Sequence, residues 1–247
     1  MISRVKRARP EPSPSGNACG IDLTFEKARI LPQMHPAPDF DPACRRCPRL
    51  AAHLTAVKAD HPDYHCAPVA AFGASRPRLL VVGLAPGLHG ANRSGRPFTG
   101  DHAGLLLYAT LHKFGWASRP DSTHQGDGLK LHGCRITNAV KCLPPENKPL
   151  PVEVRTCNDF LRAELACLEP GAAVLALGGI AHRAVLSALG LKLADHPFAH
   201  GVRHVLPAGL ILHGSYHCSR YNTQTQRLTP AMFEAVFRRI ARQFKAA

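Results

Sequence analysis

A glycine-rich loop that follows a short apolar run has the composition of a ligand-binding loop. Residues 79–82 read Leu-Leu-Val-Val, which is typical of a buried strand, and the chain then breaks into the loop. Its glycines are Gly83, Gly87, Gly90, Gly95 and Gly100. Glycine lets main-chain amides face a bound anion or a planar ring. The loop has neither Gly-x-Gly-x-x-Gly nor Gly-Lys-Ser/Thr, so we expect no nucleotide cofactor.

Polar residues follow three of the apolar runs that read as strands. Asp101 ends the glycine-rich loop, Asn138 lies near the end of residues 135–140, and a polar stretch follows His213. In parallel sheets ligands bind beyond the carboxyl ends of the strands, so we expect these stretches to converge on one site. An ordinary strand, loop and helix, with Asp101 as the N-cap of that helix, explains the first stretch equally well.

Four of the nine cysteines are candidates for metal ligands. They are Cys44 and Cys47, separated by two arginines, and the distant Cys142 and Cys157. Four thiolates close a tetrahedral site around zinc or an iron–sulfur cluster, and the spacing does not separate the two metals. Four unlinked buried cysteines are the alternative. The other five cysteines, Cys19, Cys66, Cys134, Cys167 and Cys218, have no such context.

Strands and helices alternate along the sequence. Strands are predicted at residues 79–82, 135–140, 172–178 and 209–213, and helices after Cys47 and Asp101 and at residues 151–168, 179–189 and 230–244. This alternation predicts an α/β fold with three layers, α/β/α, around a central, mainly parallel four-stranded sheet. We expect a disordered, basic and proline-rich extension over residues 1–38 and one domain over residues 39–247.

The charge of the chain favours a polyanionic partner. The net charge is +14 and the isoelectric point is near 9.8, and basic residues gather around the candidate motifs. Nucleic acid is the simplest such partner, and a basic solvated surface is the alternative. No apolar run approaches the roughly 18 residues that span a membrane, and we find no secretory signal. We therefore expect a cytoplasmic protein without membrane contact that acts as a monomer.

Three features together resemble the type-b, or family 5, uracil-DNA glycosylases. Gly83-Leu-Ala-Pro-Gly87 followed by His89-Gly-Ala-Asn-Arg-Ser-Gly-Arg-Pro-Phe-Thr-Gly-Asp101 resembles the first motif of that family. His213-Gly-Ser-Tyr-His-Cys-Ser219 resembles the second motif, although Cys218 stands where relatives often have proline. The four candidate cysteines resemble the iron–sulfur ligand set of the same family. The resemblance covers roughly residues 40 to 245.

The resemblance implies a role for each motif residue. Phe98 would stack on a flipped base, Asn138 would read the uracil edge, and His217 would face the departing base. Asp101 would position water, because Ala85 stands where other families of the superfamily place an acidic or amide residue. The resemblance also implies base contacts from Gly83, Ala85, Pro86 and Gly87, DNA contacts from Arg93, Arg96, Ser219, Arg220, Asn222 and Arg227, and a structural [4Fe-4S] cluster on Cys44, Cys47, Cys142 and Cys157.

The sequence therefore predicts a DNA repair glycosylase. It would excise uracil, and by hypothesis hypoxanthine or other damaged bases, from double- or single-stranded DNA and leave an abasic site. One alternative is an iron–sulfur module that binds DNA without chemistry, for which His217 would be dispensable. Another is a phosphoester hydrolase, but this would require a divalent metal, and the sequence has no clustered Asp/Glu set to hold one.

Overall fold

The computed structural model describes residues 40–245, so the predicted extension over residues 1–38 lies outside the described residues. The helices are α1 (Pro48–Asp60), α2 (Ala91–Ser94), α3 (His102–Lys113), α4 (Pro151–Ala166), α5 (Gly179–Ala188), α6 (Arg220–Gln224) and α7 (Pro230–Gln243). The strands are β1 (Phe72–Gly73), β2 (Leu79–Gly83), β3 (Cys134–Asn138), β4 (Ala173–Leu177), β5 (Arg203–Val205) and β6 (Ile211–Ser215). Short 3₁₀ turns lie at Pro145–Asn147 and Pro207–Gly209.

The strands form one sheet of six, in the order β1-β3-β2-β4-β6-β5. The middle four are parallel, which confirms the four predicted strands and their mainly parallel pairing. The prediction of a four-stranded sheet is wrong at both edges, where β1 and β5 add antiparallel strands. These edge strands have two and three residues, too few for an alternating pattern to be recognised in a sequence.

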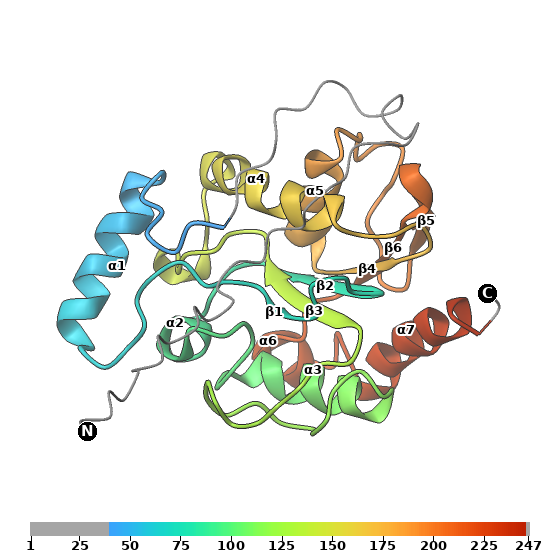
Figure 1. Cartoon of the computed structure of the whole chain (residues 1–247), viewed down its shortest axis with the longest axis horizontal. Helices are drawn as coiled ribbons and strands as arrows, with labels where there is room; N and C mark the ends of the chain where they lie inside the picture. Colours follow the sequence, from blue (N-terminus) through green and yellow to red (C-terminus); the bar gives the residue numbers. More distant parts are fainter. Residues whose placement is uncertain (1–39, 246–247) are drawn as a thin grey trace, which may run out of the picture.

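Helices cover both faces of the sheet, which gives the predicted three layers (Figure 1). All five residues of β2 and of β4 are buried, as expected of strands between two helical layers. Alternate side chains point to opposite faces. Leu79 and Val81 belong to the core shared with α3 and α7, whereas Leu80 and Val82 belong to the core shared with α4 and α5.

Helix α1 packs beside α4 rather than on the sheet. Its Leu50 joins Val140 and Phe160 in a small apolar cluster, and Arg49 makes an ion pair of 2.7 Å with Glu153 at the start of α4. This packing brings the residues just before α1 against the first turns of α4. Among residues 40–245, the helices are all too short or too polar to cross a membrane.

Candidate active site

Strand β2 ends at Gly83, and Asn138 and Phe98 lie too close to this position for any side chain to fit there. A Cβ atom on Gly83 would lie 2.4 Å from Asn138 Oδ1 and 2.6 Å from Phe98 Cζ. Gly83 is paired with Asn138 in the register of β2 and β3, so the sheet itself places the asparagine there. The absence of a side chain at this position lets the aromatic ring and the amide approach each other. Gly83, Phe98 and Asn138, predicted from separate parts of the sequence, therefore meet.

Asn138 has an acceptor that no residue satisfies. The residue is only 3% exposed, and within residues 40–245 its buried Oδ1 atom has no hydrogen-bond partner. Leaving a buried polar atom without a partner is costly, and native proteins satisfy most such atoms. The amide is therefore poised to accept a hydrogen bond from a ligand that enters beside Phe98.

His217 lies beside Phe98. Its ring lies 6.0 Å from the Phe98 ring between centroids, with an interplanar angle of 30°. The Asn222 amide nitrogen donates to the His217 carbonyl oxygen at 2.8 Å, which fixes the backbone after β6. Burial lowers the pKa of His217 to about 4, so the imidazole is neutral near pH 7. A neutral imidazole can donate one hydrogen bond and stays uncharged.

Asp101 both caps a helix and presents a carboxylate oxygen to the glycine-rich loop. Its Oδ1 accepts from the Gly104 amide at 2.7 Å, as the N-cap prediction required. A Cβ on Gly90 would lie 2.8 Å from the other oxygen, Oδ2, so that glycine is needed for the aspartate to fit. Burial raises the pKa of Asp101, and the hydrogen bonds from Gly104 and Ala103 oppose this shift. The carboxylate also raises the pKa of the buried Cys218 thiol, after the larger effect of burial, so the two groups are electrostatic neighbours.

The four predicted cysteine ligands line one cavity between α1, α4 and the segment after β3. Burial, together with the nearby thiols of Cys157, Cys44 and Cys47, raises the pKa of Cys142 to about 12. The Lys141 backbone N–H donates to the Cys157 sulfur at 3.3 Å. In the part of the chain that the structure describes, no three His, Cys, Asp or Glu side chains are spaced to hold a single metal ion. The thiols thus surround a space without gathering on one point.

Comparison with known proteins identifies the family. The family model described as Uracil DNA glycosylase superfamily matches residues 70–241, more than half of the chain. The chain belongs to this superfamily. A type-5 uracil-DNA glycosylase of Thermus thermophilus is 48% identical over 77% of this chain and 89% of its own length. Similar type-5 proteins occur in Mycobacterium bovis, at 46% identity over 79% of this chain and 76% of theirs, and in Pyrobaculum aerophilum, at 43% over 80% and 88%.

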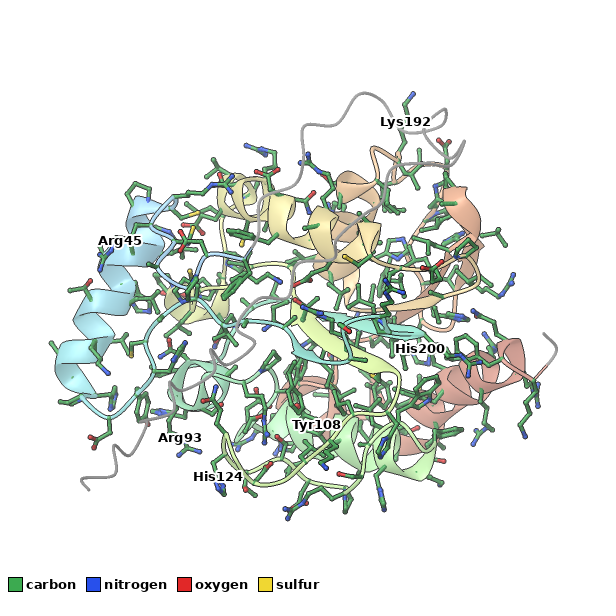
Figure 2. The ribbon with its side chains drawn as sticks, in the orientation of Figure 1. Arg45, Arg93, Tyr108, His124, Lys192 and His200 are labelled. Carbon is green, nitrogen blue, oxygen red and sulfur yellow. The ribbon has the colours of Figure 1, made fainter. Side chains whose placement is uncertain are left out.

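The arginines assigned to DNA in this uracil-DNA glycosylase superfamily member separate into two groups. Arg93 is exposed and extends from the region of α2 at the edge of the molecule (Figure 2). Arg220 and Arg227 are also exposed, and the Arg227 guanidinium lies 4.8 Å from the Tyr216 ring centroid. Arg96 is different, because its side chain is 6% exposed and paired with Asp127. The structure gives Arg96 an internal contact rather than a place on the surface.

Several other residues in or near the motifs make contacts within the protein. The Ser219 hydroxyl accepts a hydrogen bond from the Asn222 backbone N–H at 3.4 Å, so Ser219 is the N-cap of α6. Pro86 is buried, and Ala85 packs with the apolar cluster around the cysteines. Lys141, counted among the basic residues near the motifs, is 1% exposed and pairs with Glu164 at 2.8 Å.

Sequence reasoning missed Tyr221. This side chain lies on α6, four residues after His217, and is 69% exposed. Its position directly after the exposed Arg220, on the short helix that follows His217, makes Tyr221 a candidate binding residue. The available signal was an aromatic residue within an otherwise polar loop, directly after Arg220.

Proposed function

We propose that this chain is a type-5 uracil-DNA glycosylase, which hydrolyses the N-glycosidic bond of deoxyuridine in DNA and leaves an abasic site. The similarity to type-5 proteins over more than three quarters of the chain supports this proposal. The observation that carries it is the buried, unpartnered Asn138 Oδ1 close to the Phe98 ring, because it leaves a hydrogen-bond acceptor beside an aromatic face.

Asn138 would distinguish uracil from cytosine by their hydrogen-bond patterns. Uracil presents a ring N–H donor beside a carbonyl acceptor, whereas cytosine presents an acceptor beside an amino donor. The Asn138 Oδ1 would accept from the uracil N–H, and its amide nitrogen would donate to the adjacent carbonyl. With cytosine, the Asn138 Oδ1 would face the ring-nitrogen acceptor and the Asn138 amide nitrogen would face the amino donor, so neither hydrogen bond could form. Phe98 would hold the ring by stacking, which any base satisfies, so the specificity lies with the amide.

His217 would stabilise the departing base without protonating it. As the bond between the sugar carbon C1′ and the base nitrogen breaks, both electrons leave with uracil, and negative charge develops on its carbonyl oxygen. The low pKa of His217 makes the neutral ring a hydrogen-bond donor and a poor proton donor. One well-aimed donor at a developing oxyanion contributes about 3 to 4 kcal/mol.

Asp101 would position the attacking water. The water oxygen forms the new bond to C1′, and its proton passes to the carboxylate or to solvent. Burial of Asp101 supports this role, since a partly desolvated carboxylate is a better base. Gly90 leaves room for the Asp101 side chain itself to take this position. All of these groups come from one chain, so we propose that a monomer is active.

The segment that follows β6 would bind the DNA and fill the gap left by the flipped nucleotide. Arg220, Tyr221 and Arg227 are all exposed in this segment. Arginines attract phosphates, and an aromatic wedge can enter a base step. We extend the proposed DNA contacts to Tyr221 and remove Arg96 from them.

The four cysteines line one cavity, which supports a shared metal centre. We assign it to an iron–sulfur cluster on the resemblance of this cysteine set to that of the type-5 family. Cys44, Cys47, Cys142 and Cys157 would hold a [4Fe-4S] cluster, which would supply a cross-link rather than reaction chemistry. It would tie the segment before α1 to the segment after β3, which leads back to Asn138. Brown protein with stoichiometric iron and sulfide would support this assignment, and colourless protein with one zinc would contradict it.

Excision from a labelled oligonucleotide with one uracil tests the proposed function, scored as alkali-labile breaks. Matched strands with thymine, cytosine and hypoxanthine show the range of bases, and single- and double-stranded forms show the strand preference. We expect breaks at uracil that are lost in His217→Ala, and none at cytosine. Folded protein that binds the strand without breaking it would contradict the glycosylase and favour a DNA-binding module.

A further inference from the structure

The buried ion pair between Arg96 and Asp127 joins the glycine-rich loop to a distant loop. Arg96 lies two residues before Phe98, and Asp127 lies in the polar segment of residues 118–132, to which the sequence gave no role. The Arg96 Nη1 donates to Asp127 Oδ1 at 3.0 Å, and Nη2 donates to Oδ2, so the pair is bidentate. Their side chains are 6% and 1% exposed. This pair is therefore shielded from both solvent and DNA.

The remaining Arg96 donors bind the same two loops. Its Nε donates to Thr99 Oγ1 at 2.9 Å, and Nη2 also donates to Ser122 Oγ at 2.6 Å. The hydroxyls of Thr99 and Ser122 lie 2.6 Å apart. On the other face, the Arg96 guanidinium lies 4.9 Å from the Phe72 ring centroid. Contacts on its edge and its face thus hold the guanidinium.

Asp127 is equally constrained. Its Oδ2 accepts from the Thr123 backbone amide at 2.9 Å, and its Oδ1 accepts from the Leu129 amide at 3.0 Å. The hydrogen bonds from Arg96 hold the pKa of Asp127 well below its usual range. The carboxylate therefore organises its own loop and anchors Arg96 at the same time.

Phe98 requires such support because its backbone is strained. Its φ is +55°, a left-handed conformation that bulky residues rarely adopt. Neighbouring contacts hold the peptide on both sides. Tyr108 donates to the Pro97 carbonyl at 2.8 Å, and a Cβ on Gly104 would lie 1.9 Å from the Phe98 carbonyl oxygen. Figure 2 shows Tyr108 among the side chains near α3.

We propose that Arg96 and Asp127 are positioning residues, which hold the strained Phe98 backbone so that its ring faces the base pocket beside Gly83. This inference rests on the proposed function, in which Phe98 stacks on the flipped uracil. The ion pair contacts neither the base nor the DNA. It acts through residues 97–99. We call the Arg96–Asp127 pair, with its contacts to residues 97–99 and to the loop of residues 118–132, the clamp.

The test compares four readouts in Arg96→Met, Arg96→Lys and Asp127→Asn. They are the single-turnover excision rate at saturating enzyme, inhibition by free uracil, affinity for a duplex with an abasic site, and the unfolding temperature. We expect Arg96→Met to slow excision roughly 100-fold, as a misplacement of about 1 Å does. Inhibition by uracil should weaken, while affinity for the abasic duplex should stay within about twofold, since the DNA-facing arginines are untouched. Arg96→Lys, which keeps the charge without the fork, should lie between.

A matched control is Arg238→Met, which removes an arginine from an exposed ion pair with Glu234 on α7. It should excise uracil at the wild-type rate. Asp127→Asn keeps the size of the side chain and tests the clamp even if Arg96→Met does not fold. The double variant should be no slower than the slower single variant, because both changes remove one interaction.

Three results would overturn parts of the proposal, and they are distinguishable. If the variants excise uracil at the wild-type rate, the clamp does not position Phe98. If excision, uracil inhibition, abasic-duplex affinity and the unfolding temperature all fall together, the pair is merely structural. If the wild-type protein itself does not excise uracil but binds DNA, the proposed function fails before the clamp is tested.

Discussion

The two loops that form the pocket are built in opposite ways. The loop of residues 83–101 is mostly buried and braced, with Phe98 and Arg96 both close to 5% exposed. The loop of residues 216–229 carries the exposed Arg220 and Tyr221, and its helix α6 has only five residues. A hydrogen bond of 2.9 Å between His102 Nε2, at the start of α3 directly after the first loop, and Thr223 Oγ1 joins α3 to the second loop.

This difference indicates that excision and DNA binding depend on different residues. A preorganised pocket must be rigid, because its rate depends on sub-ångström placement. A surface that meets many DNA sequences needs exposed charges and a protruding side chain instead. We therefore expect changes at the buried residues of the first loop and at His217 to lower the excision rate, and changes at the exposed Arg220 and Tyr221 to lower binding.

The largest expected effect is that of Asp101→Asn. Asparagine is as good an N-cap as aspartate, so the bond to the Gly104 amide and the stability of α3 should be kept. Removing the carboxylate should slow single-turnover excision by about 10²- to 10⁴-fold, the range for general base groups. The unfolding temperature should change little. An unchanged excision rate would leave Asp101 with the capping role alone.

Gly83→Ala should act almost as strongly, through shape. The new methyl group would lie within 2.7 Å of both the Asn138 amide and the Phe98 ring, which must separate. We expect roughly 100-fold slower excision and a loss of about 1 to 3 kcal/mol of stability from overpacking. Abasic-duplex affinity should persist, as measured by fluorescence anisotropy. A variant with normal excision would mean that the pocket is not formed by these three residues.

The pH profile of single-turnover excision tests the roles assigned to His217 and Asp101. His217 must be neutral and Asp101 must be charged, so both lose function as the pH falls. For His217 the loss comes near its pKa of about 4, and for Asp101 it comes at the raised pKa of its carboxyl. Excision should thus fall as the pH is lowered toward these two pKa values. A decline between pH 7 and pH 6 that persists in Asp101→Asn would contradict a neutral His217.

Tyr221→Ala should have the smallest effect on chemistry and the clearest effect on strand preference. Loss of one stacking contact should weaken binding to uracil-containing duplex by about tenfold, within the range for a base–aromatic contact. Single-stranded DNA, which has no gap to fill, should be affected less. The ratio of the two affinities is the measurement. Equal loss on both substrates would assign Tyr221 to general stacking rather than to the duplex gap.

The core elements and the candidate pocket residues could be predicted from the sequence because their signals are local. The apolar runs that became β2, β3, β4 and β6 are contiguous, and helices α4, α5 and α7 follow their predicted ranges closely. Asp101 was predicted as an N-cap from its neighbours alone, and it caps α3. Resemblance then supplied the roles that local chemistry left open for Phe98, Asn138 and His217.

Arg93 and Arg96 show where sequence reasoning ended. They belong to one motif and have the same chemistry, yet one is exposed and the other is buried. The partner that decides this, Asp127, is 31 residues away in a polar segment without periodicity. Lys141 is similar, since Glu164, 23 residues later, neutralises it inside the protein. Burial of a charge depends on a partner that only folding brings close.

The sequence by itself determined the α/β alternation, the strand ends that carry the polar residues, and the motifs of a uracil-DNA glycosylase. Tertiary structure alone decided which basic residues reach the surface, that two short strands complete the sheet, and that Phe98 adopts a left-handed backbone. The physical reason is the distance along the chain over which each effect acts. Propensity and periodicity act over a few residues, whereas ion pairs, close approaches and backbone strain are settled between segments that meet only in the folded chain.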